Sequence, residues 1–414
     1  MHKFGRLDYI KITLLGFAIT AMWQALHTII LPLRLLDFTP EADKNTALGI
    51  ITFIGLVLAM LVQPVAGAMS DRSGHAWGRR RPFVLLGGGL AVLFLPGFAT
   101  FTGFAAILTV YCLLQISTNI AQGPFQGLIP DIVPGHRRGR ASGVKTMLEI
   151  VGGAIAVYVI GQLMGHYEAG EGSSWLWLSL GIIMLVMAVT VAYTMLAVRE
   201  KKIESGPKIS PLEVIRRTFG LNLRANRPFA WFLASRLLVF MAFTTIQQFA
   251  LYYLRDVIGV DDPPAATANF TIVAVAGMLA AVYPAGYFSD RIGRKPIAAA
   301  SGLLAAFGVA VIFLSHDYTS ILVAAGILGV AIGAFNSTNW ALATDLVAKG
   351  EEARYLGLAN VATAGGAALA RLIGPVIDFF NKTGPGLGYQ VMLAASFFYF
   401  IAGALLVLKI KGHR

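Results

Sequence analysis

The chain has 414 residues, of which 57% are hydrophobic and only 13% are charged. A soluble protein of this size would carry about a quarter charged residues, so the composition excludes an ordinary soluble protein and indicates one that lies largely within a membrane. The single cysteine, Cys112, excludes a disulfide within one chain and a cysteine-based metal site. In a soluble protein the net charge of +12 would suggest nucleic acid as a partner, but here it lies in short loops, as expected at the cytoplasmic face of a membrane.

Apolar runs of about 20 residues or more, long enough to cross a bilayer as helices, fill almost the whole chain. Those of the first half lie at residues 9–33, 46–69, 83–103, 104–131, 141–164 and 174–197. Those of the second half lie at residues 229–254, 267–288, 296–315, 319–347, 355–379 and 388–408. Because the runs are apolar on all sides and too long for barrel strands, the sequence predicts an all-α membrane protein with twelve transmembrane helices.

The predicted helices fall into two pseudo-symmetric groups, separated by the only long polar stretch. We expect an N-terminal six-helix bundle at residues 1–198, a cytoplasmic linker at 199–228 and a C-terminal six-helix bundle at 229–414. The even number of spans places both termini on one side of the membrane, together with the linker and most lysines and arginines. The opposite loops hold only Arg34, Lys44, Arg255 and Lys382. Since positive residues gather on the cytoplasmic side, we expect a multi-pass protein of the plasma (inner) membrane with cytoplasmic termini and a first span that is retained.

A short phrase after the second predicted span recurs after the eighth. The copies run Gly67-Ala-Met-Ser-Asp71-Arg72, closing with Gly78-Arg-Arg-Arg, and Gly286-Tyr-Phe-Ser-Asp290-Arg291, closing with Gly293-Arg-Lys. At one constant shift and without gaps, Asp131, Arg140 and Gly143 also align with Asp345, Arg354 and Gly357. A charged phrase between two spans, repeated once per half, is typical of a duplicated transporter.

At these residues the chain resembles the major facilitator superfamily. The Gly-x-x-Ser-Asp-Arg…Gly-Arg-Arg-Arg signature and its counterpart are specific to that fold, so the resemblance covers essentially the whole chain. Within it, Trp77-Gly-Arg-Arg-Arg-Pro-Phe83 and Gln122-Gly-Pro-Phe-Gln-Gly-Leu-Ile-Pro-Asp131 are similar to the sucrose/proton symporter and SLC45-type branch, to which the glycoside–pentoside–hexuronide symporters are related. That branch implies proton-coupled symport of a sugar or glycoside by alternating access. Plant sucrose transporters place an arginine in the fourth span where this chain has Gln126, so sugar binding or coupling is expected to differ there.

The resemblance also implies a cytoplasmic gate. In the superfamily the aspartate of the repeated phrase packs against the N-terminus of the eleventh span, which relieves a carboxylate at the negative end of its own helix. We expect Asp71 to meet the span that starts near Arg354, and Asp290 the span that starts near Arg140, in contacts that break on inward opening. The expected gate residues are Asp71, Arg72, Arg79, Arg80, Asp131, Arg140, Asp290, Arg291, Arg294, Asp345 and Arg354. The alternative is that the arginines are orientation signals only.

Amide side chains recur at helical spacing along the first, fourth, seventh and tenth spans. Positions three, four and seven apart share one face of a helix, and amides that faced lipid would each cost several kcal/mol. In the superfamily fold these four spans line the central cavity, where amides next to aromatic rings suit a hydroxyl-rich solute. The expected substrate-binding residues are Gln24, His27, Asn119, Gln122, Gln126, Gln247, Gln248, Asn336, Asn339 and Trp340. The alternative is that the amides only hold helices together.

Charged residues inside a predicted membrane span indicate a functional site. Glu149 lies about two turns into the fifth span, with Lys145 one turn before it on the same face. Glu149 is the predicted proton carrier, because burial raises a carboxyl pKa and a nearby lysine lowers it. A static Lys145–Glu149 pair is the alternative, and Asp131, Asp345 and His27 compete for the proton role.

Other substrates and other protein classes leave different signals. Arg236 and Arg371 are intramembrane charges that suit an anionic substrate, such as a hexuronide or another small organic anion. A proton-coupled exporter of amphipathic compounds would show a more apolar cavity. An enzyme is not expected, because the seven histidines are scattered and no nucleotide-binding loop occurs, so we predict neither a metal nor a cofactor. The expected partners are a small polar solute such as a sugar, a proton and the lipid bilayer, without nucleic acid and with the chain acting as a monomer.

Overall fold

The structure, a computed structural model, describes residues 5–75, 77–198, 200, 226–346 and 352–410. Within these residues every regular element is helical, and twelve helices are long and apolar enough to cross a membrane. The predicted all-α class with twelve transmembrane helices is therefore confirmed. Most of the expected linker at 199–228 lies outside the described residues.

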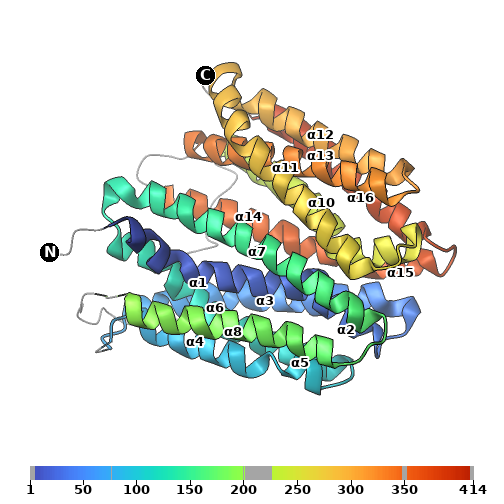
Figure 1. Cartoon of the computed structure of the whole chain (residues 1–414). Coiled ribbons are helices and arrows are strands. Elements are labelled where there is room, and N and C mark those ends of the chain that lie inside the picture. Colours follow the sequence, from blue (N-terminus) through green and yellow to red (C-terminus); the bar gives the residue numbers. More distant parts are fainter. Residues whose placement is uncertain (1–4, 76, 199, 201–225, 347–351, 411–414) are drawn as a thin grey trace. The chain divides into compact units, whose positions relative to one another are not determined.

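The chain divides into two compact units (Figure 1). Unit 1 comprises Met1–Phe38 and Ile54–Arg217, and unit 2 comprises Thr39–Phe53 and Thr218–Arg414. The division differs from the expected bundles at α3 (Lys44–Asp71), because the first residues of this helix pack with C-terminal segments. The boundaries of the expected bundles stay a prediction.

Unit 1 is a bundle of helices. Its first span consists of three consecutive segments, α1 (Arg6–Ala25), the π-helical turn η1 (Leu26–Ile30) and α2 (Leu31–Leu36). The rest of the unit holds the greater part of α3, α4 (Arg81–Phe94), α5 (Gly97–Thr100), α6 (Phe104–Ile132), η3 (Gly135–Arg137), α7 (Arg138–Glu168) and α8 (Ser174–Ala197). Helix α1 packs against α7 and α8, and α4 packs against α6 and α8 (Figure 1).

Unit 2 is a second bundle of helices. Its N-terminal part is the short η2 (Glu41–Asp43) with the start of α3, and its seventh span runs through α10 (Arg227–Tyr253) into the π-helical turn η4 (Leu254–Ile258). The remaining helices are α11 (Pro263–Ile292), α12 (Arg294–Leu314), α13 (Tyr318–Leu346), α14 (Glu352–Arg371), α15 (Gly374–Asn381) and α16 (Leu387–Leu408). Helix α13 packs between α11 and α12, while α10 packs against α14 and α16.

Glycines allow the helices of unit 2 to approach closely. A Cβ atom at Gly333 of α13 would meet the backbone carbonyl of Met278 in α11. In the same way a Cβ atom at Gly366 of α14 would meet the carbonyl of Leu237 in α10. Without a hydrophobic drive between helices in lipid, such close backbone contact is a main source of association.

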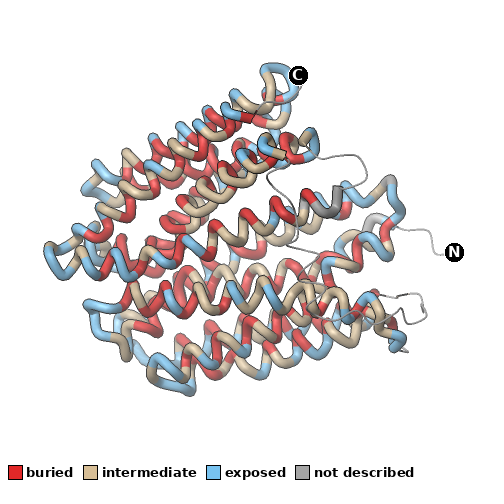
Figure 2. The backbone as a smooth tube through the Cα atoms, turned by 180° about the vertical axis from the view of Figure 1, so that it is seen from behind, coloured by how far each residue is buried: buried red, intermediate tan, exposed pale blue. Residues whose placement is uncertain are grey.

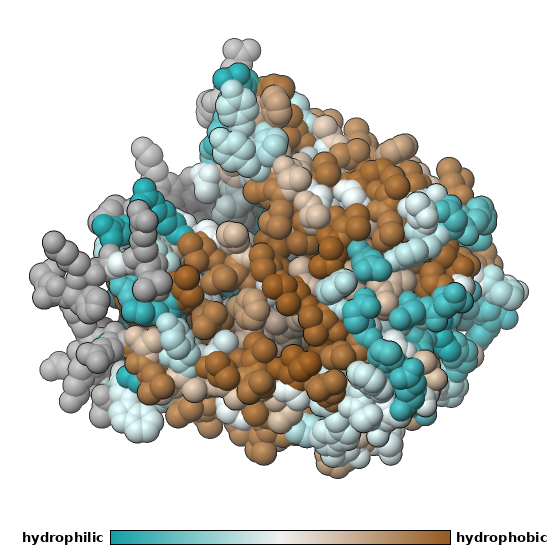
Figure 3. Space-filling model, viewed as in Figure 1, coloured by the Kyte–Doolittle hydropathy of each residue, from teal (hydrophilic) through white to brown (hydrophobic). Residues whose placement is uncertain are grey.

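The outer surface of the helices is apolar. Figure 2 shows buried and exposed residues alternating along each helix, and Figure 3 shows hydrophobic residues over the middle of the helices with hydrophilic residues towards their ends. Large side chains exposed on these helices include Leu93, Leu185, Leu196, Tyr283 and Phe379. Such a surface suits the hydrocarbon of a bilayer rather than water.

Candidate functional site

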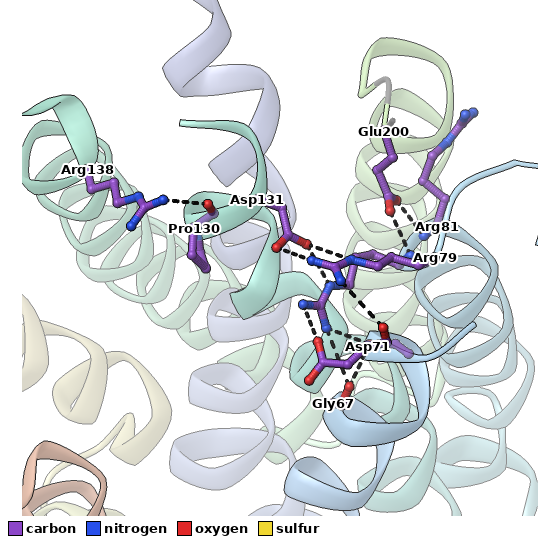
Figure 4. A network of polar contacts seen from close by, with 10 residues as sticks. Gly67, Asp71, Arg79, Arg81, Pro130, Asp131, Arg138 and Glu200 are labelled. Carbon is purple, nitrogen blue, oxygen red and sulfur yellow. Dashed lines mark hydrogen bonds and ion pairs between the residues drawn. The ribbon is translucent and has the colours of Figure 1, made fainter. Parts of the chain in front are cut away.

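The first repeated phrase forms ion pairs at the end of α3 (Figure 4). The Arg80 guanidinium pairs with the carboxylates of Asp71 and Asp131, its Nε lying 3.0 Å from Oδ2 of Asp131, and donates to the Ser70 hydroxyl at 2.7 Å. Arg79 pairs with the same Asp131 carboxylate, with its Nε 3.2 Å from Oδ2. These contacts join α3 to α6. The side chains of Arg80 and Asp131 are 7% and 17% exposed, so their pair is little screened by salt, whereas Asp71 is 52% exposed and its pair with Arg80 is screened more.

A carboxylate that the sequence analysis did not single out holds the start of α4. Glu200 accepts the backbone N–H groups of Arg80 and Arg81, both at 2.9 Å (Figure 4). The first N–H groups of a helix have no partner within the helix and carry partial positive charge, so an acceptor there is favourable. We call Asp71, Arg79, Arg80, Asp131 and Glu200 the motif-end network.

The second copy of the phrase forms a smaller arrangement in unit 2. Arg294 lies 2.6 Å from the carboxylate of Asp345 and 3.8 Å from that of Asp290. Arg291 instead lies over the ring of Tyr287, 4.3 Å from its centre. Asp131 and Asp345, which the repeat aligns, thus each receive an arginine from their own unit.

The other expected gate residues are placed as follows. Arg72 donates to the carbonyl of Ala68 at 3.3 Å, and Arg140 is exposed at the start of α7. The side chain of Arg354 lies outside the described residues. The expected contacts of Asp71 and Asp290 with the starts of other spans stay predictions.

A polar and aromatic cluster lies among the spans of unit 1. Nε2 of His27 lies 2.6 Å from the hydroxyl of Tyr111, which also accepts an N–H of Gln115 at 3.0 Å. One turn further along α6, Asn119 donates to the carbonyl of Gln115 at 2.8 Å. The Trp23 ring stacks on His27 at 4.9 Å and meets Tyr111 edge-on at 5.6 Å. We call these five residues the amide–aromatic cluster.

The local fold explains the position of this cluster. His27 lies in the π-helical turn η1, a widening of the helix that is frequent at functional sites. Tyr111 is fully buried against Gly55 of α3, where an added Cβ would collide with its ring. His27 and Asn119 were predicted from the sequence, whereas Tyr111 was not. The signal was present, because Tyr111 extends the amide stripe by one turn towards the start of α6.

The remaining expected amides of unit 1 lie apart from the cluster. Gln24 packs against Gly153 of α7. Gln122 is half-buried and Gln126 is exposed. Among the described residues neither Gln122 nor Gln126 forms a hydrogen bond, so both amides are available to water or to a solute.

Lys145 and Glu149, the expected proton-coupling residues, form an ion pair, and their role stays a prediction. Nζ of Lys145 lies 3.0 Å from Oε1 of Glu149, and the two side chains are 19% and 21% exposed. Lys145 also lies 5.9 Å from the centre of the Phe125 ring. Glu149 packs against Gly16, where a Cβ atom would come within 2.7 Å of its carboxylate. The pair therefore lies where α1, α6 and α7 meet.

A buried arginine organises the polar residues of unit 2. Nε of Arg236 donates to the Thr363 hydroxyl at 2.7 Å, and Nη1 donates to Oδ1 of Asn339 at 2.6 Å. The guanidinium carbon lies 4.9 Å from the ring centre of Phe240 and 5.1 Å from that of Trp340. Arg236 is 4% exposed and Asn339 is fully buried, whereas Trp340 is 39% exposed. We call these five residues the arginine site.

The other expected residues of unit 2 surround this site without joining it. Gln248 is buried and Gln247 half-buried on α10, and Asn336 is exposed on α13, one turn from Trp340. Arg371, the second expected intramembrane arginine, is buried at the end of α14 and donates to the carbonyl of Ala367.

A further network lies at the end of α3 opposite the repeated phrase. Asp378 of α15 accepts the side-chain N–H of Asn45 at 2.8 Å and the backbone N–H of Thr46 at 2.6 Å. Asn45 and Asp378 are buried, 0% and 3% exposed. Gly374, at the start of α15, lies so close to Asn45 that a Cβ atom would collide with its carbonyl.

Lys44 completes this arrangement. Its Nζ lies 2.7 Å from Oδ2 of Asp256 in η4, and the hydroxyl of Tyr389 in α16 donates to the same carboxylate at 2.5 Å. Lys44 and Tyr389 are 3% and 1% exposed. We call Lys44, Asn45, Asp256, Asp378 and Tyr389 the α3-start network. The sequence analysis missed it, although an aspartate inside the predicted span at 355–379 was itself a signal.

Nothing in the described part of the chain gathers three or more His, Cys, Asp or Glu side chains that could hold a metal ion.

Known proteins resemble this chain in sequence and in fold. The sequence matches the model of the Major Facilitator Superfamily at residues 7–370 and, in a second match, 262–413. The uncharacterized protein Rv2265 of Mycobacterium tuberculosis is 26% identical over 337 residues, which cover 78% of this chain and 76% of that protein. The sucrose transport protein SUT1 of Oryza sativa subsp. japonica is 30% identical over 143 residues, 29% of this chain and 25% of SUT1. A D-xylose-proton symporter superposes with a TM-score of 0.72 over 98% of both chains at 15% identity, which shows a shared fold alone.

Proposed function

Because the chain belongs to the major facilitator superfamily, we propose that it is a secondary active transporter that moves a sugar or glycoside together with a proton by alternating access. The superfamily match and the fold make it a membrane transporter and not an enzyme. The proposal places it in the plasma (inner) membrane as a monomer, with both termini in the cytoplasm.

The amide–aromatic cluster is the observation that carries this proposal. Its side chains lie in membrane-spanning helices, where unsatisfied polar groups are costly, yet it offers donors, acceptors and ring faces together. The Trp23 ring is half-buried beside His27, and a sugar presents hydroxyl groups and an apolar ring face that match such a surface. The partial match to SUT1, a sucrose transport protein, supports the same substrate class.

Alternating access needs contacts that form and break at both ends of the spans. The motif-end network and the α3-start network lie at opposite ends of one helix, α3. Both depend on charged groups whose partners come from other helices, so each supports a discrete closed arrangement rather than a gradual one.

The Lys145–Glu149 pair supports the coupling step. Protonation of Glu149 would remove the charge that Lys145 attracts and loosen the contact between them. Separation from Lys145 would in turn favour the protonated carboxyl, so that movement of α7 and proton binding depend on each other.

Uptake into proteoliposomes tests the proposal. Labelled sucrose, maltose, glucose and a glucuronide are supplied to the purified full chain with and without an inward proton gradient. We expect uptake of one sugar that rises with the gradient and loses that dependence in Glu149→Gln. The matched control is Glu171→Gln, which removes an exposed partner of His166.

Each other outcome points to a definite correction. Gradient-driven uptake that Glu149→Gln leaves unchanged would keep the symporter and move the proton to another group. Extrusion of amphipathic compounds without any sugar flux would replace sugar uptake by export.

A further inference from the structure

We propose that the arginine site binds the anionic group of the transported solute, so that the substrate is a sugar acid or glycosiduronate rather than a neutral sugar. This inference rests on the proposed transport function and narrows its substrate class. It is carried by the surroundings of Arg236, whose charge is buried among neutral groups.

The first step is the charge balance at Arg236. Its described partners are the Thr363 hydroxyl, the Asn339 amide oxygen, the backbone carbonyl of Ala359 at 3.2 Å and two aromatic rings. None of them is charged, and within the described part of the chain Arg236 forms no ion pair with a carboxylate. A buried guanidinium still keeps its proton at neutral pH, because arginine is the most basic side chain in proteins. The site therefore holds a positive charge that lacks a negative partner, which is costly in a membrane-spanning bundle.

The second step is the orphan donor next to this charge. The amide oxygen of Asn339 is engaged by Arg236, while its Nδ2 is buried and has no hydrogen-bond partner. A buried donor without a partner costs about 1–3 kcal/mol. A carboxylate has two oxygens that each accept more than one hydrogen bond, so one such group can satisfy both the guanidinium and the amide.

One side of the arginine site is exposed. Trp340 is 39% exposed beside the guanidinium, and Asn336 is exposed one turn earlier on the same face of α13. A ring face and an amide next to a positive charge suit a ring-bearing solute with hydroxyl groups and a carboxylate. Arginine, planar and bidentate, is suited to carboxylates in a way that lysine is not.

A purely structural role for Arg236, holding α10 to α13 and α14 through neutral acceptors, makes the opposite prediction. It requires no preference for an anion, whereas a binding role requires a preference that disappears with the guanidinium.

The test compares pairs of ligands in which a carboxylate replaces a neutral hydroxymethyl group. Binding of phenyl β-D-glucosiduronate and phenyl β-D-glucoside, and of benzoate and benzyl alcohol as a pair without sugar, is measured on the purified full chain by ligand-induced thermal stabilisation. We expect at least about tenfold tighter binding of the glucosiduronate than of the glucoside, as for one charge-assisted contact. In Arg236→Gln this ratio is expected to fall to near one.

Two further variants serve as controls. Arg236→Lys keeps the positive charge but loses the planar guanidinium that can donate two parallel hydrogen bonds. This variant should fold and show an intermediate ratio of glucosiduronate to glucoside affinity. Lys409 is exposed at the end of α16, and its Nζ lies 5.3 Å from the ring centre of Trp231. Lys409→Gln removes this cation and should leave the ratio unchanged.

The outcomes separate this inference from the proposed function. Equal or tighter binding of the glucoside by the wild type would overturn the inference and leave sugar transport standing. Binding of benzoate alone, lost in Arg236→Gln, would keep the anion site and overturn the sugar class. If no carboxylate binds more tightly than its neutral counterpart, the inference is wrong whatever uptake shows.

Discussion

Tyr111 is the residue on which the amide–aromatic cluster depends. Its hydroxyl is shared by His27 and Gln115 in a fully buried position. Tyr111→Phe would remove the buried hydroxyl that His27 and Gln115 share, so we expect a loss of about 1–3 kcal/mol in stability. If the cluster binds the solute, the affinity should also fall about tenfold.

Thermal unfolding and the KM for uptake measure these two effects. Tyr158→Phe is the matched control, because Tyr158 is 46% exposed on α7 and its loss should change neither quantity. A stable Tyr111→Phe variant with an unchanged KM would mean that the cluster neither holds the helices nor binds the solute.

Arg80 is the centre of the motif-end network. It is shared by two carboxylates and the Ser70 hydroxyl while its side chain is 7% exposed. Arg80→Gln would leave Asp131 with Arg79 alone and Asp71 without its pair, so we expect the free energy of unfolding to fall by about 3 kcal/mol. The part of the effect that comes from Asp131 should persist in high salt, since pairs with little exposure are weakly screened, while the part from Asp71, which is 52% exposed, should weaken.

Chemical denaturation in detergent at two salt concentrations provides the measurement. Arg72→Gln, which removes one contact with a backbone carbonyl, should change stability by less than about 0.5 kcal/mol. Equal effects of the two substitutions would show that the network contributes nothing beyond an ordinary surface charge.

At the scale of elements, the neighbouring Gly365 and Gly366 of α14 have different roles. A Cβ atom at Gly366 would collide with the carbonyl of Leu237 in α10, while a Cβ atom at Gly365 meets nothing within 4 Å. Gly366→Ala should therefore force α14 from α10 and destabilise the chain by about 1–3 kcal/mol. Gly365→Ala should be neutral or stabilising by up to about 1 kcal/mol, because alanine favours a helix.

The unfolding temperatures of the two variants, compared with the wild type, test this difference. The pair is its own control, since the substitutions are identical and adjacent. Equal shifts would contradict the close approach of the two helices at Gly366.

The sequence could predict the helices themselves, because a span needs only a long apolar run and each run was present. It could also predict the Lys145–Glu149 pair, since residues one turn apart on a helix meet by geometry. It could not predict the path of the first span through η1, because nothing in the composition of Leu26–Ile30 distinguishes a π turn from an α turn. The widening places His27 against Tyr111, a contact that only packing determines.

Contacts between segments that are distant in the sequence could not be predicted either. Asn45 and Asp378 are 333 positions apart, so no local pattern connects them. The repeat predicted that Asp131 and Asp345 are equivalent, because it aligns corresponding positions of the two halves of the chain. The α3-start network has no counterpart in the repeat. It depends on the packing of α3, α15 and α16, which the sequence does not show.

The α3-start network should control access to one face of the transporter. Asp378→Asn keeps the size of the side chain but removes the charge that holds Asn45 and the backbone N–H of Thr46. The hydrogen bonds to a charged acceptor are worth about 1.5–3 kcal/mol, so the start of α3 should leave α15 at least about tenfold more often. Ala47, 5% exposed, is covered in the present arrangement. A cysteine at this position, in a Cys112→Ser background, should therefore react about tenfold faster with a membrane-impermeant maleimide.

The control for this experiment is Asp317→Asn. Asp317 also accepts a backbone N–H at a helix start, from Ser320 at 2.9 Å, but it is exposed and lies at the start of α13. Its substitution should leave the labelling rate unchanged, because it holds no other helix. Unchanged labelling in Asp378→Asn, or equal acceleration in both variants, would show that the network is a static brace. Faster labelling in Asp378→Asn alone would identify it as a contact that opens during transport, because only a closure in equilibrium with an open form responds to the loss of one charge in this way.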